Sequence, residues 1–370
     1  IGEGRKIGEI GVVPGTNEKV YIAEKFPRIT LICGRQRSGK TFCTRVLIEE
    51  LSKDPKNHFV ILDPKSEFSF QHVIKDGYKP PSERVYSNED GTLKLKFSDM
   101  DFSSLTKTLF SNEYQPSAIL FESVLKRTKE EKGNFTPGDA IVSLIKYWAG
   151  FGVDEELAVY IDTLPKAVKN AVLHRLRSLD NMGVFTANGG ITVKDLLETS
   201  VTRIVIHDTP VATKIVLKGL IGRILQERQR LAEKYIEMDA KGIRRPEWHR
   251  IILVVEEAHL YSRLPEIINY VKIGGYAALG GIFISQRPVS VSPEVTSQIN
   301  AIMIFKLVSD RDIEWVRRNS PVYIPPKYIE IFKKLDVGEC IVAASGKEDI
   351  LTKIKIREAY TYHYGKSLWV

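Results

Sequence analysis

The stretch from Gly34 to Thr41 constrains this chain most, because it fits the pattern Gly-x4-Gly-Lys-[Ser/Thr]. Residues 29–32 before it are mostly apolar and predict a buried strand, and residues 42–51 after it predict an amphipathic helix. In such a unit the loop N–H groups and the helix N-terminus bind phosphates, the lysine reaches the outer phosphates, and the threonine ligates Mg²⁺. The sequence therefore predicts a site for ATP and Mg²⁺, with Gly34, Arg37, Ser38, Gly39, Lys40, Thr41 and Phe42 as its nucleotide-binding residues.

Composition places the chain among globular proteins. It has 370 residues, of which 43% are hydrophobic and 27% charged, enough for one large domain with insertions. Its apolar runs are far shorter than the ~18 residues that a membrane span needs. We expect a cytoplasmic protein, although the chain begins at isoleucine, so a preceding segment that attaches it to a membrane stays open. The net charge of +8 favours a polyanionic partner, and a lysine-rich surface is the plain alternative.

The order of predicted elements indicates an α/β fold with a mostly parallel sheet. Residues 1–28 predict short β segments, which we interpret as the end of a small β-domain. Strands are predicted at residues 57–62, 93–97, 203–208, 251–255, 281–285 and 301–307, with a long helix over residues 212–238 and closing strands at 339–343 and 351–357. Residues 29–101 and 189–357 would form the ATPase core, and 358–370 a C-terminal tail.

Residues 102–188 differ from the rest because their apolar positions recur at helical spacing. We expect a helical insertion, broken near Gly133 to Gly138 and again near Gly150 to Pro165. Its basic residues, in Lys166 to Lys169 and His174 to Arg177, are more typical of a solvated face than of a nucleic-acid surface.

Two acidic residues follow the most apolar strand, residues 251–255. Glu256, at the end of that strand, would hold the Mg²⁺ shell through water together with Thr41, and Glu257 would orient or deprotonate the attacking water. An acidic strand end that faces solvent is the plain alternative. Glutamate at 256 stands where aspartate is commoner, which leaves the division of roles between the two acids open.

Gln286 follows the strand at residues 281–285. An amide both donates and accepts, so it could sense the γ-phosphate or the attacking water. The alternative is a glutamine that caps a loop.

Taken together, these motifs resemble the HerA/FtsK superfamily of hexameric DNA-translocating ATPases, in its archaeal HerA-like branch. The resemblance lies in Arg28 before the first strand, Asp63-Pro64-Lys65-Ser66-Glu67, Val255-Glu256-Glu257-Ala258-His259, Ile284-Ser285-Gln286-Arg287-Pro288, the segment 292–300 and Leu335 to Glu339. It covers residues 7–357, and the helical insertion matches loosely. Ser66 stands where the family has glycine.

The resemblance implies a RecA-like core and a homo-hexameric ring around DNA. In that setting Arg28 would reach a neighbour's nucleotide in trans, Gln286 would sense the γ-phosphate, and Arg287 would be a second candidate finger. HerA-like proteins carry a Gly-Arg-Lys run before the sensor strand, whereas this chain has Lys272-Ile-Gly-Gly-Tyr276. Lys272 and Tyr276 are the predicted DNA contacts, and Gly274 and Gly275 are interpreted as easing a helix-to-strand turn.

The leading hypothesis is an ATP-driven translocase or helicase that moves double-stranded DNA without sequence preference, as HerA-like proteins do with a nuclease partner. Two alternatives stay open at this stage. One is a membrane-associated DNA-transfer or import ATPase of conjugation type. The other is a slow nucleotide-dependent assembly switch. Cys33, Cys43 and Cys340 have no metal-ligand spacing and are interpreted as packing residues.

Overall fold

A computed structural model describes the whole chain except residues 17, 154, 208, 245 and 363–370. By contacts it divides into two compact units. The sheet unit comprises Ile1–Val85, Lys194–Val205 and Arg228–Val370, and the helical unit comprises Tyr86–Val193 and Ile206–Glu227. Most of the predicted tail, 358–370, lies outside the described residues, as does residue 208 at the end of a predicted strand.

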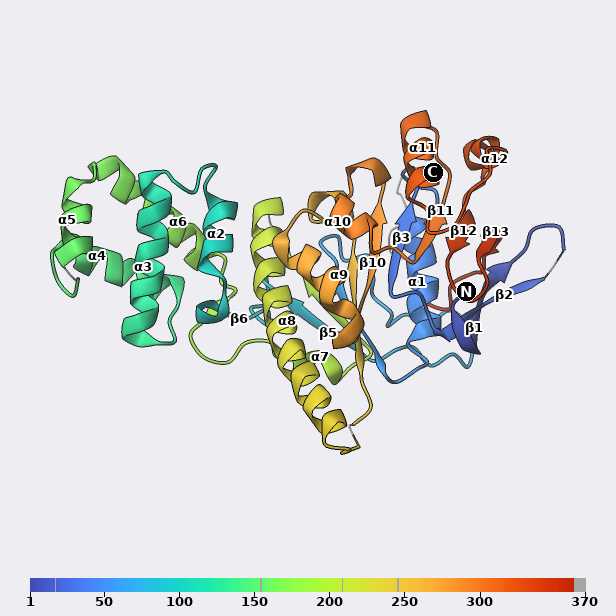
Figure 1. Ribbon diagram of the computed structural model, residues 1–370, viewed down its shortest axis with the longest axis horizontal. Helices are drawn as coiled ribbons and strands as arrows, with labels where there is room; N and C mark the ends of the chain where they lie inside the picture. Colours follow the sequence, from blue (N-terminus) through green and yellow to red (C-terminus); the bar gives the residue numbers. More distant parts are fainter. Residues whose placement is uncertain (17, 154, 208, 245, 363–370) are drawn as a thin grey trace. The chain divides into compact units, whose positions relative to one another are not determined.

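An 11-stranded sheet forms the centre of the sheet unit (Figure 1). Its order is β2-β1-β13-β12-β11-β3-β10-β9-β4-β8-β5. The strands are β1 (Glu3–Val12), β2 (Lys19–Lys25), β3 (Ile29–Cys33), β4 (Asn57–Leu62), β5 (Glu83–Ser87), β8 (Val201–Val205), β9 (Arg250–Val255), β10 (Leu279–Ser285), β11 (Ala301–Ile304), β12 (Glu339–Ala344) and β13 (Ile350–Ile356).

The middle of this sheet is parallel. β11, β3, β10, β9, β4 and β8 pair in parallel, whereas β12 and β13 pair antiparallel beyond β11. The register places Ser285 beside Cys33, and Leu62 beside Val255. The carboxyl ends of β3, β4, β9 and β10 therefore meet at one edge, which is where ligands bind in sheets of this kind. This is the RecA-like arrangement that the sequence predicted.

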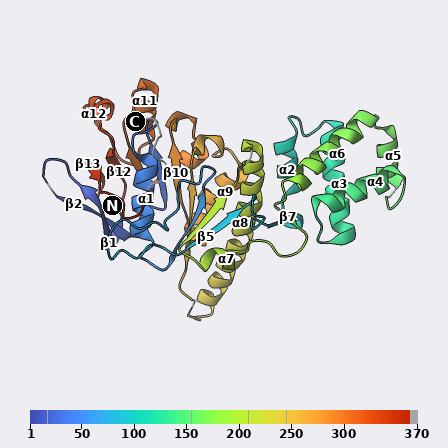
Figure 2. The same cartoon turned by 180° about the vertical axis from the view of Figure 1, so that it is seen from behind.

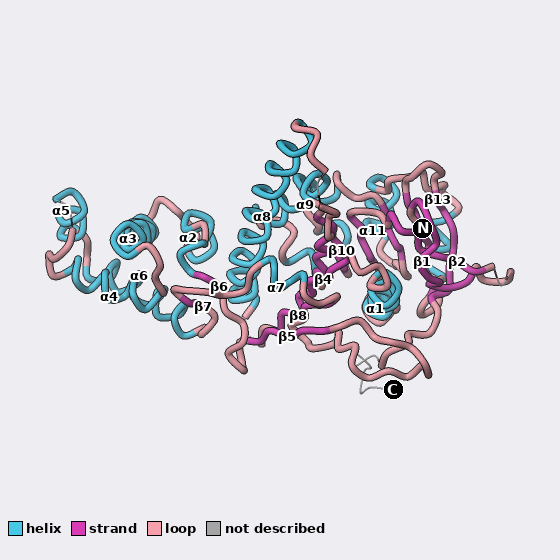
Figure 3. The backbone as a smooth tube through the Cα atoms, turned by 90° about the horizontal axis from the view of Figure 1, so that it is seen from below, coloured by secondary structure: helices cyan, strands magenta, loops and turns pink. Residues whose placement is uncertain are grey.

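Helices cover both faces of the sheet, which is why β3, β4, β8 and β10 are buried along their whole length. Helix α1 (Lys40–Leu51) packs on one face (Figure 2), and α9 (Pro265–Ala277) packs on the other, as the view from below shows (Figure 3). The remaining helices of four or more residues are α2 (Phe102–Leu109), α3 (Pro116–Lys132), α4 (Pro137–Trp148), α5 (Glu155–Thr163), α6 (Lys166–Asn181), α7 (Val193–Leu197), α8 (Pro210–Ala240), α10 (Pro293–Thr296), α11 (Asp310–Asn319) and α12 (Tyr328–Lys334).

The helical unit has a core of its own. Leu120, Phe121, Leu144 and Leu176 are fully buried in it, and they come from α3, α4 and α6. Thr136 begins α4 with a capping box that also involves Asp139, which explains the break predicted near Gly133 to Gly138.

Three local predictions need correction. Only Leu95–Lys96 of the strand predicted at 93–97 is a strand, β6, and it pairs with β7 (Phe185–Thr186) outside the large sheet. The edge strand β5 was not predicted, because its polar sequence Glu-Arg-Val-Tyr-Ser lacks an apolar run. Gly274 and Gly275 lie inside α9 rather than in a turn.

The N-terminal strands extend the large sheet, since β1 pairs with β13. The cysteines match their interpretation, because Cys33, Cys43 and Cys340 are all free and buried. Within the described residues no helix combines the length and apolar character needed to cross a bilayer.

Candidate nucleotide site

The loop between β3 and α1 is shaped by two glycines with positive φ. Gly34 has φ 149°, and a Cβ there would lie 2.6 Å from the Phe305 Cβ. Gly39 has φ 106°, and its Cβ would lie 3.1 Å from the Cα of Gly338. A side chain at either position would therefore clash or strain the backbone, so sterics fix both glycines.

Lys40 begins α1 and lies inside the loop. Only 8% of its surface is exposed, and its Nζ donates a hydrogen bond to the Arg35 carbonyl oxygen at 2.8 Å. The Ser38 hydroxyl donates to the same carbonyl. Burial lowers the pKa of Lys40 to about 8. A cation held in a desolvated loop attracts anions strongly, as binding to the outer phosphates requires.

Glu256 follows β9 and reaches the first turn of α1. Its Oε1 accepts a hydrogen bond from the Thr41 hydroxyl at 2.9 Å, and the residue is only 6% exposed. Burial, followed by the nearby charge of Glu67, raises the pKa of Glu256 to about 7. The two predicted Mg²⁺ residues are therefore in direct contact.

Glu257 and Gln286 meet across the ends of neighbouring strands. The Gln286 amide Nε2 donates to Glu257 Oε1 at 2.6 Å. Glu257 has φ 48°, an uncommon conformation for a non-glycine residue that often marks a functional site. Lys65 Nζ lies 3.9 Å from Glu257 Oε1, and His259 Nδ1 lies 3.6 Å from Oε2. The Gln286 amide therefore orients the Glu257 carboxylate, and Lys65 adds a nearby positive charge.

These side chains line one cavity of about 260 Å³. Arg37 and Phe42 line it as well, and Arg37 has φ 60° and is exposed. Arg287 is exposed at the end of β10 and is not among the residues that line this cavity. All the predicted nucleotide-binding residues from Arg37 to Phe42 line this cavity, except Ser38. The Ser38 hydroxyl instead holds the loop in shape through its hydrogen bond to the Arg35 carbonyl oxygen.

The cavity fits a magnesium nucleotide by its donor set. Within the described residues no three His, Cys, Asp or Glu side chains form a metal site by themselves. Thr41 and Glu256 supply two oxygen ligands or hydrogen-bond partners, which matches the way P-loop proteins hold Mg²⁺ with phosphate oxygens and water.

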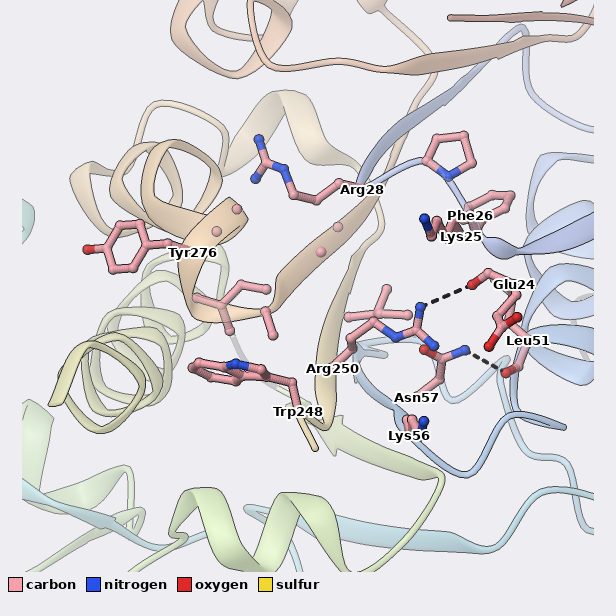
Figure 4. A pocket seen from close by; sticks show the side chains of 18 of the residues that line it. Glu24, Lys25, Phe26, Arg28, Leu51, Lys56, Asn57, Trp248, Arg250 and Tyr276 are labelled. Carbon is pink, nitrogen blue, oxygen red and sulfur yellow. Dashed lines mark hydrogen bonds between the residues drawn. The ribbon is translucent and has the colours of Figure 1, made fainter. Parts of the chain in front are cut away.

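Arg28 lies at the opposite edge of the sheet, before β3 rather than after it. Its Nη1 donates to the Val271 carbonyl oxygen at 2.7 Å, and its Nη2 donates to Gln298 Oε1 at 3.3 Å. A Cβ at Gly274 would lie 2.6 Å from this Nη1 and 2.7 Å from the Leu279 carbonyl oxygen, so the backbone requires glycine there. Tyr276 is 53% exposed near Arg28 (Figure 4), and Lys272 is exposed on the same helix. The structure does not bring these three residues to the nucleotide cavity.

The model of the family described as Helicase HerA, central domain, matches residues 9–227, more than half of the chain. The chain belongs to this HerA central-domain family. Its core is that of a P-loop ATPase, the class of enzyme that uses ATP with Mg²⁺.

Curated relatives agree with the family. The DNA double-strand break repair helicase HerA of Pyrococcus furiosus is 21% identical over 361 residues, with 86% of this chain and 63% of the relative covered. A probable helicase of Methanocaldococcus jannaschii is 23% identical over 384 residues, with 95% of this chain and 70% of the relative covered. The chain therefore spans about two thirds of the length of these two relatives.

Solved structures show the same fold. VirB4 of Thermoanaerobacter pseudethanolicus has a TM-score of 0.61 at 14% identity and covers 96% of this chain and 97% of its own. The plasmid coupling protein TrwB, in complex with a non-hydrolysable ATP analogue, has a TM-score of 0.61 at 12% identity, with coverages of 98% and 97%.

The HerA-type turn after β4 supplies residues that sequence reasoning did not assign to the site. Asp63 is fully buried and binds Arg203, and its carboxylate accepts the N–H groups of Glu67 and Phe68. Ser66 has φ 54°, a conformation that glycine adopts more readily than other residues. The turn therefore has a fixed shape.

Glu67 is held on both sides by this turn, and its side chain lines the nucleotide cavity. Its N–H donates to Asp63, and its carbonyl oxygen accepts from Arg45, a fully buried residue of α1. Burial raises the pKa of Glu67. The only signal in the sequence was an acidic residue four positions after Asp63, where an Asp-Pro pair ends the strand.

Gly338 supports the phosphate loop from β12. Its N–H donates to the Ser38 carbonyl oxygen at 3.0 Å. The sequence offered Leu335 to Glu339 only as a family motif, because a contact between residues three hundred positions apart leaves no local pattern.

Proposed function

We propose that this chain is the motor core of a ring-shaped homo-hexamer that hydrolyses ATP and moves double-stranded DNA without sequence preference. The observation that carries the proposal is the division of groups along β3. Lys40, Thr41, Glu256, Glu257 and Gln286 gather at one end of that strand, and Arg28 is fixed at the other. β3 has five residues, so roughly 20 Å separate Arg28 from Gly34 at ~3.3 Å per residue.

Within one subunit, the residues divide the chemistry as follows. Lys40 and the loop N–H groups bind the phosphates, and Thr41 and Glu256 hold the Mg²⁺ shell, which neutralises phosphate charge. Glu257 orients the attacking water or takes its proton, and the Gln286 amide holds Glu257 in place. An arginine side chain is far too short to span β3, so Arg28 would act at the nucleotide of a second copy.

The DNA part of the proposal rests on family membership and on the excess of positive charge. A motor that moves along any sequence needs phosphate contacts rather than base contacts, and such binding weakens steeply with salt. The setting is either DNA repair with a nuclease or DNA transfer at a membrane channel.

The test is ATP turnover with and without double-stranded DNA of unrelated sequences. We expect stimulation by every sequence, with a DNA affinity that falls by several orders of magnitude between about 50 and 200 mM salt. Slow turnover that DNA does not change at any salt concentration would instead favour an assembly switch.

Light scattering with a non-hydrolysable ATP analogue tests the ring separately, since a protein that stays monomeric under all conditions contradicts the hexamer.

A further inference from the structure

A second cavity of the sheet unit lies at the amino-terminal edge of the sheet, on the side of Arg28. It measures about 710 Å³ and is lined by Arg28, by the starts of β4, β9 and β10 and by residues toward the ends of β2, α1, α8 and α9. This volume is in the range of small-molecule sites and exceeds that of the ATP cavity. Arg28 is the one lining residue that the proposed motor uses, and Tyr276 was predicted to contact DNA.

Four aromatic residues line this cavity, and two of them, Trp248 and Tyr276, come from different parts of the chain (Figure 4). Trp248 precedes β9, and its ring is fixed by an edge contact with Tyr235, with 4.7 Å between centroids. The Arg228 guanidinium lies 5.7 Å from the Trp248 centroid. Tyr276 projects from the end of α9 and is 53% exposed. Exposed aromatic faces held in place are the surfaces on which nucleobases stack.

The charge of the lining is mainly positive. Four cations line the cavity, against the single carboxylate of Glu24: Lys25, Arg28, Lys56 and Arg250. Arg250 is oriented by the Glu24 carbonyl oxygen and by Asp54, and Lys56 pairs with Glu247 at 3.0 Å. Arg28 uses two of its five N–H donors in the bonds described above, which leaves donors for an anion. Cations that neighbouring residues hold in a fixed position can donate hydrogen bonds to the oxygens of a phosphate group.

Glycines leave part of the wall without side chains. Gly274 and Gly275 both line the cavity, and a Cβ at Gly275 would meet nothing within 4 Å. Tyr276 follows these two glycines, so the part of the wall without side chains lies beside an aromatic ring.

We propose that this cavity binds one nucleotide unit, with its base against Trp248 and Tyr276 and its phosphate beside Lys25 and Arg250. The unit comes either from a free mononucleotide or from a single strand of nucleic acid, since both offer the same base and phosphate. This site goes beyond the proposed motor, because it is separate from the ATP cavity and does not require hydrolysis or a ring.

The test uses the Lys40→Ala chain, in which the ATP cavity no longer competes for nucleotide. One arm measures binding of thymidine monophosphate by calorimetry, and the other measures binding of a labelled oligo-dT by fluorescence anisotropy. Trp248→Ala removes the stacking surface. Gly275→Leu fills the cavity mouth, where the added side chain has room and suits a helix. Gly222→Leu is the matched control, because a Cβ at this helical glycine also meets nothing within 4 Å.

We expect Trp248→Ala and Gly275→Leu to weaken binding at least fivefold in one of the two arms, and Gly222→Leu to leave it unchanged. Loss in the mononucleotide arm identifies a free nucleotide as the ligand, and loss in the oligo-dT arm alone identifies a single strand.

Two results would overturn the site: no binding in either arm, or binding that both substitutions leave unchanged. Gly275→Leu keeps the test decisive if Trp248→Ala fails to fold. DNA-stimulated turnover in the native chain is measured independently, so failure of this site leaves the motor proposal standing.

Discussion

The two edges of the parallel sheet are built from opposite kinds of residue. At the carboxyl edge, the phosphate loop, two lysines and three carboxylates surround a small polar cavity. At the amino edge, arginines and aromatic rings surround a larger cavity. Neither predicted finger, Arg28 or Arg287, lines the carboxyl-edge cavity, and Arg28 lies at the amino edge, roughly 20 Å from Gly34 of its own chain at ~3.3 Å per residue. The difference teaches that the groups expected to act on one nucleotide are divided between the two edges, as the proposed action of Arg28 in trans requires.

The largest effect is expected when one edge is altered in one chain and the other edge in a second chain. Arg28→Ala is expected to lower kcat by about 10³-fold or more, the scale of an arginine finger. Mixtures of Arg28→Ala and Lys40→Ala chains should recover part of the turnover, because an intact cavity can then meet an intact Arg28. Turnover against mixing ratio is the measurement. If no mixing ratio restores turnover, Arg28 does not act in trans. Each variant measured alone is the control.

The second largest effect is expected at the carboxyl edge alone. Glu257→Gln keeps the shape of the side chain but cannot take a proton, so kcat should fall by about 10²- to 10⁴-fold while ATP still binds. Single-turnover kinetics and nucleotide affinity separate the two effects. Glu294→Gln, at an exposed glutamate of α10, is the matched control. Native turnover in Glu257→Gln would remove Glu257 from the mechanism.

The third prediction uses the pKa of Glu256. Because burial raises it from 4.5 to about 7, the folded chain binds more protons than the unfolded chain between those values. The free energy of unfolding should therefore fall as the pH rises from 5 to 8, by about 2–3 kcal/mol from this group. In Glu256→Gln this part of the pH dependence should disappear, as denaturation at several pH values would reveal. Equal pH profiles for the two proteins would mean that Glu256 is not desolvated in this way.

The smallest effects concern one strained residue at each edge. Ser66 near the ATP cavity and Ala278 at the other cavity have φ 54° and 53°, where a side chain disfavours the backbone. Ser66→Gly and Ala278→Gly should each change the free energy of unfolding by no more than about 1 kcal/mol, in the stabilising direction, since relief of strain opposes the greater chain entropy of glycine. Thermal shifts measure this. A clear loss of stability in Ser66→Gly would show that the Ser66 side chain holds the turn.

Local pattern predicted much of the fold and of the site. The P-loop, the strand that ends at Glu256 and the strand that ends at Gln286 all carry their own signal, because a buried strand in a parallel sheet is apolar along its whole length. The strand β5 escaped prediction because an edge strand needs no such run. Glu67 escaped for a different reason: it enters the site only through its contacts with Asp63 and Arg45.

The sequence by itself determined that this chain folds as a P-loop ATPase core, since glycines, lysine and threonine at fixed spacing need no distant partner to be recognised. Only the tertiary structure decided which groups meet. It places Gln286 on Glu257, Glu67 beside Glu256, and Gly338 behind the phosphate loop, because strand order and register bring together residues that are far apart in the chain. It also placed the Arg28 guanidinium against the Val271 carbonyl oxygen and the Gln298 amide oxygen, contacts that no local pattern in the sequence predicts.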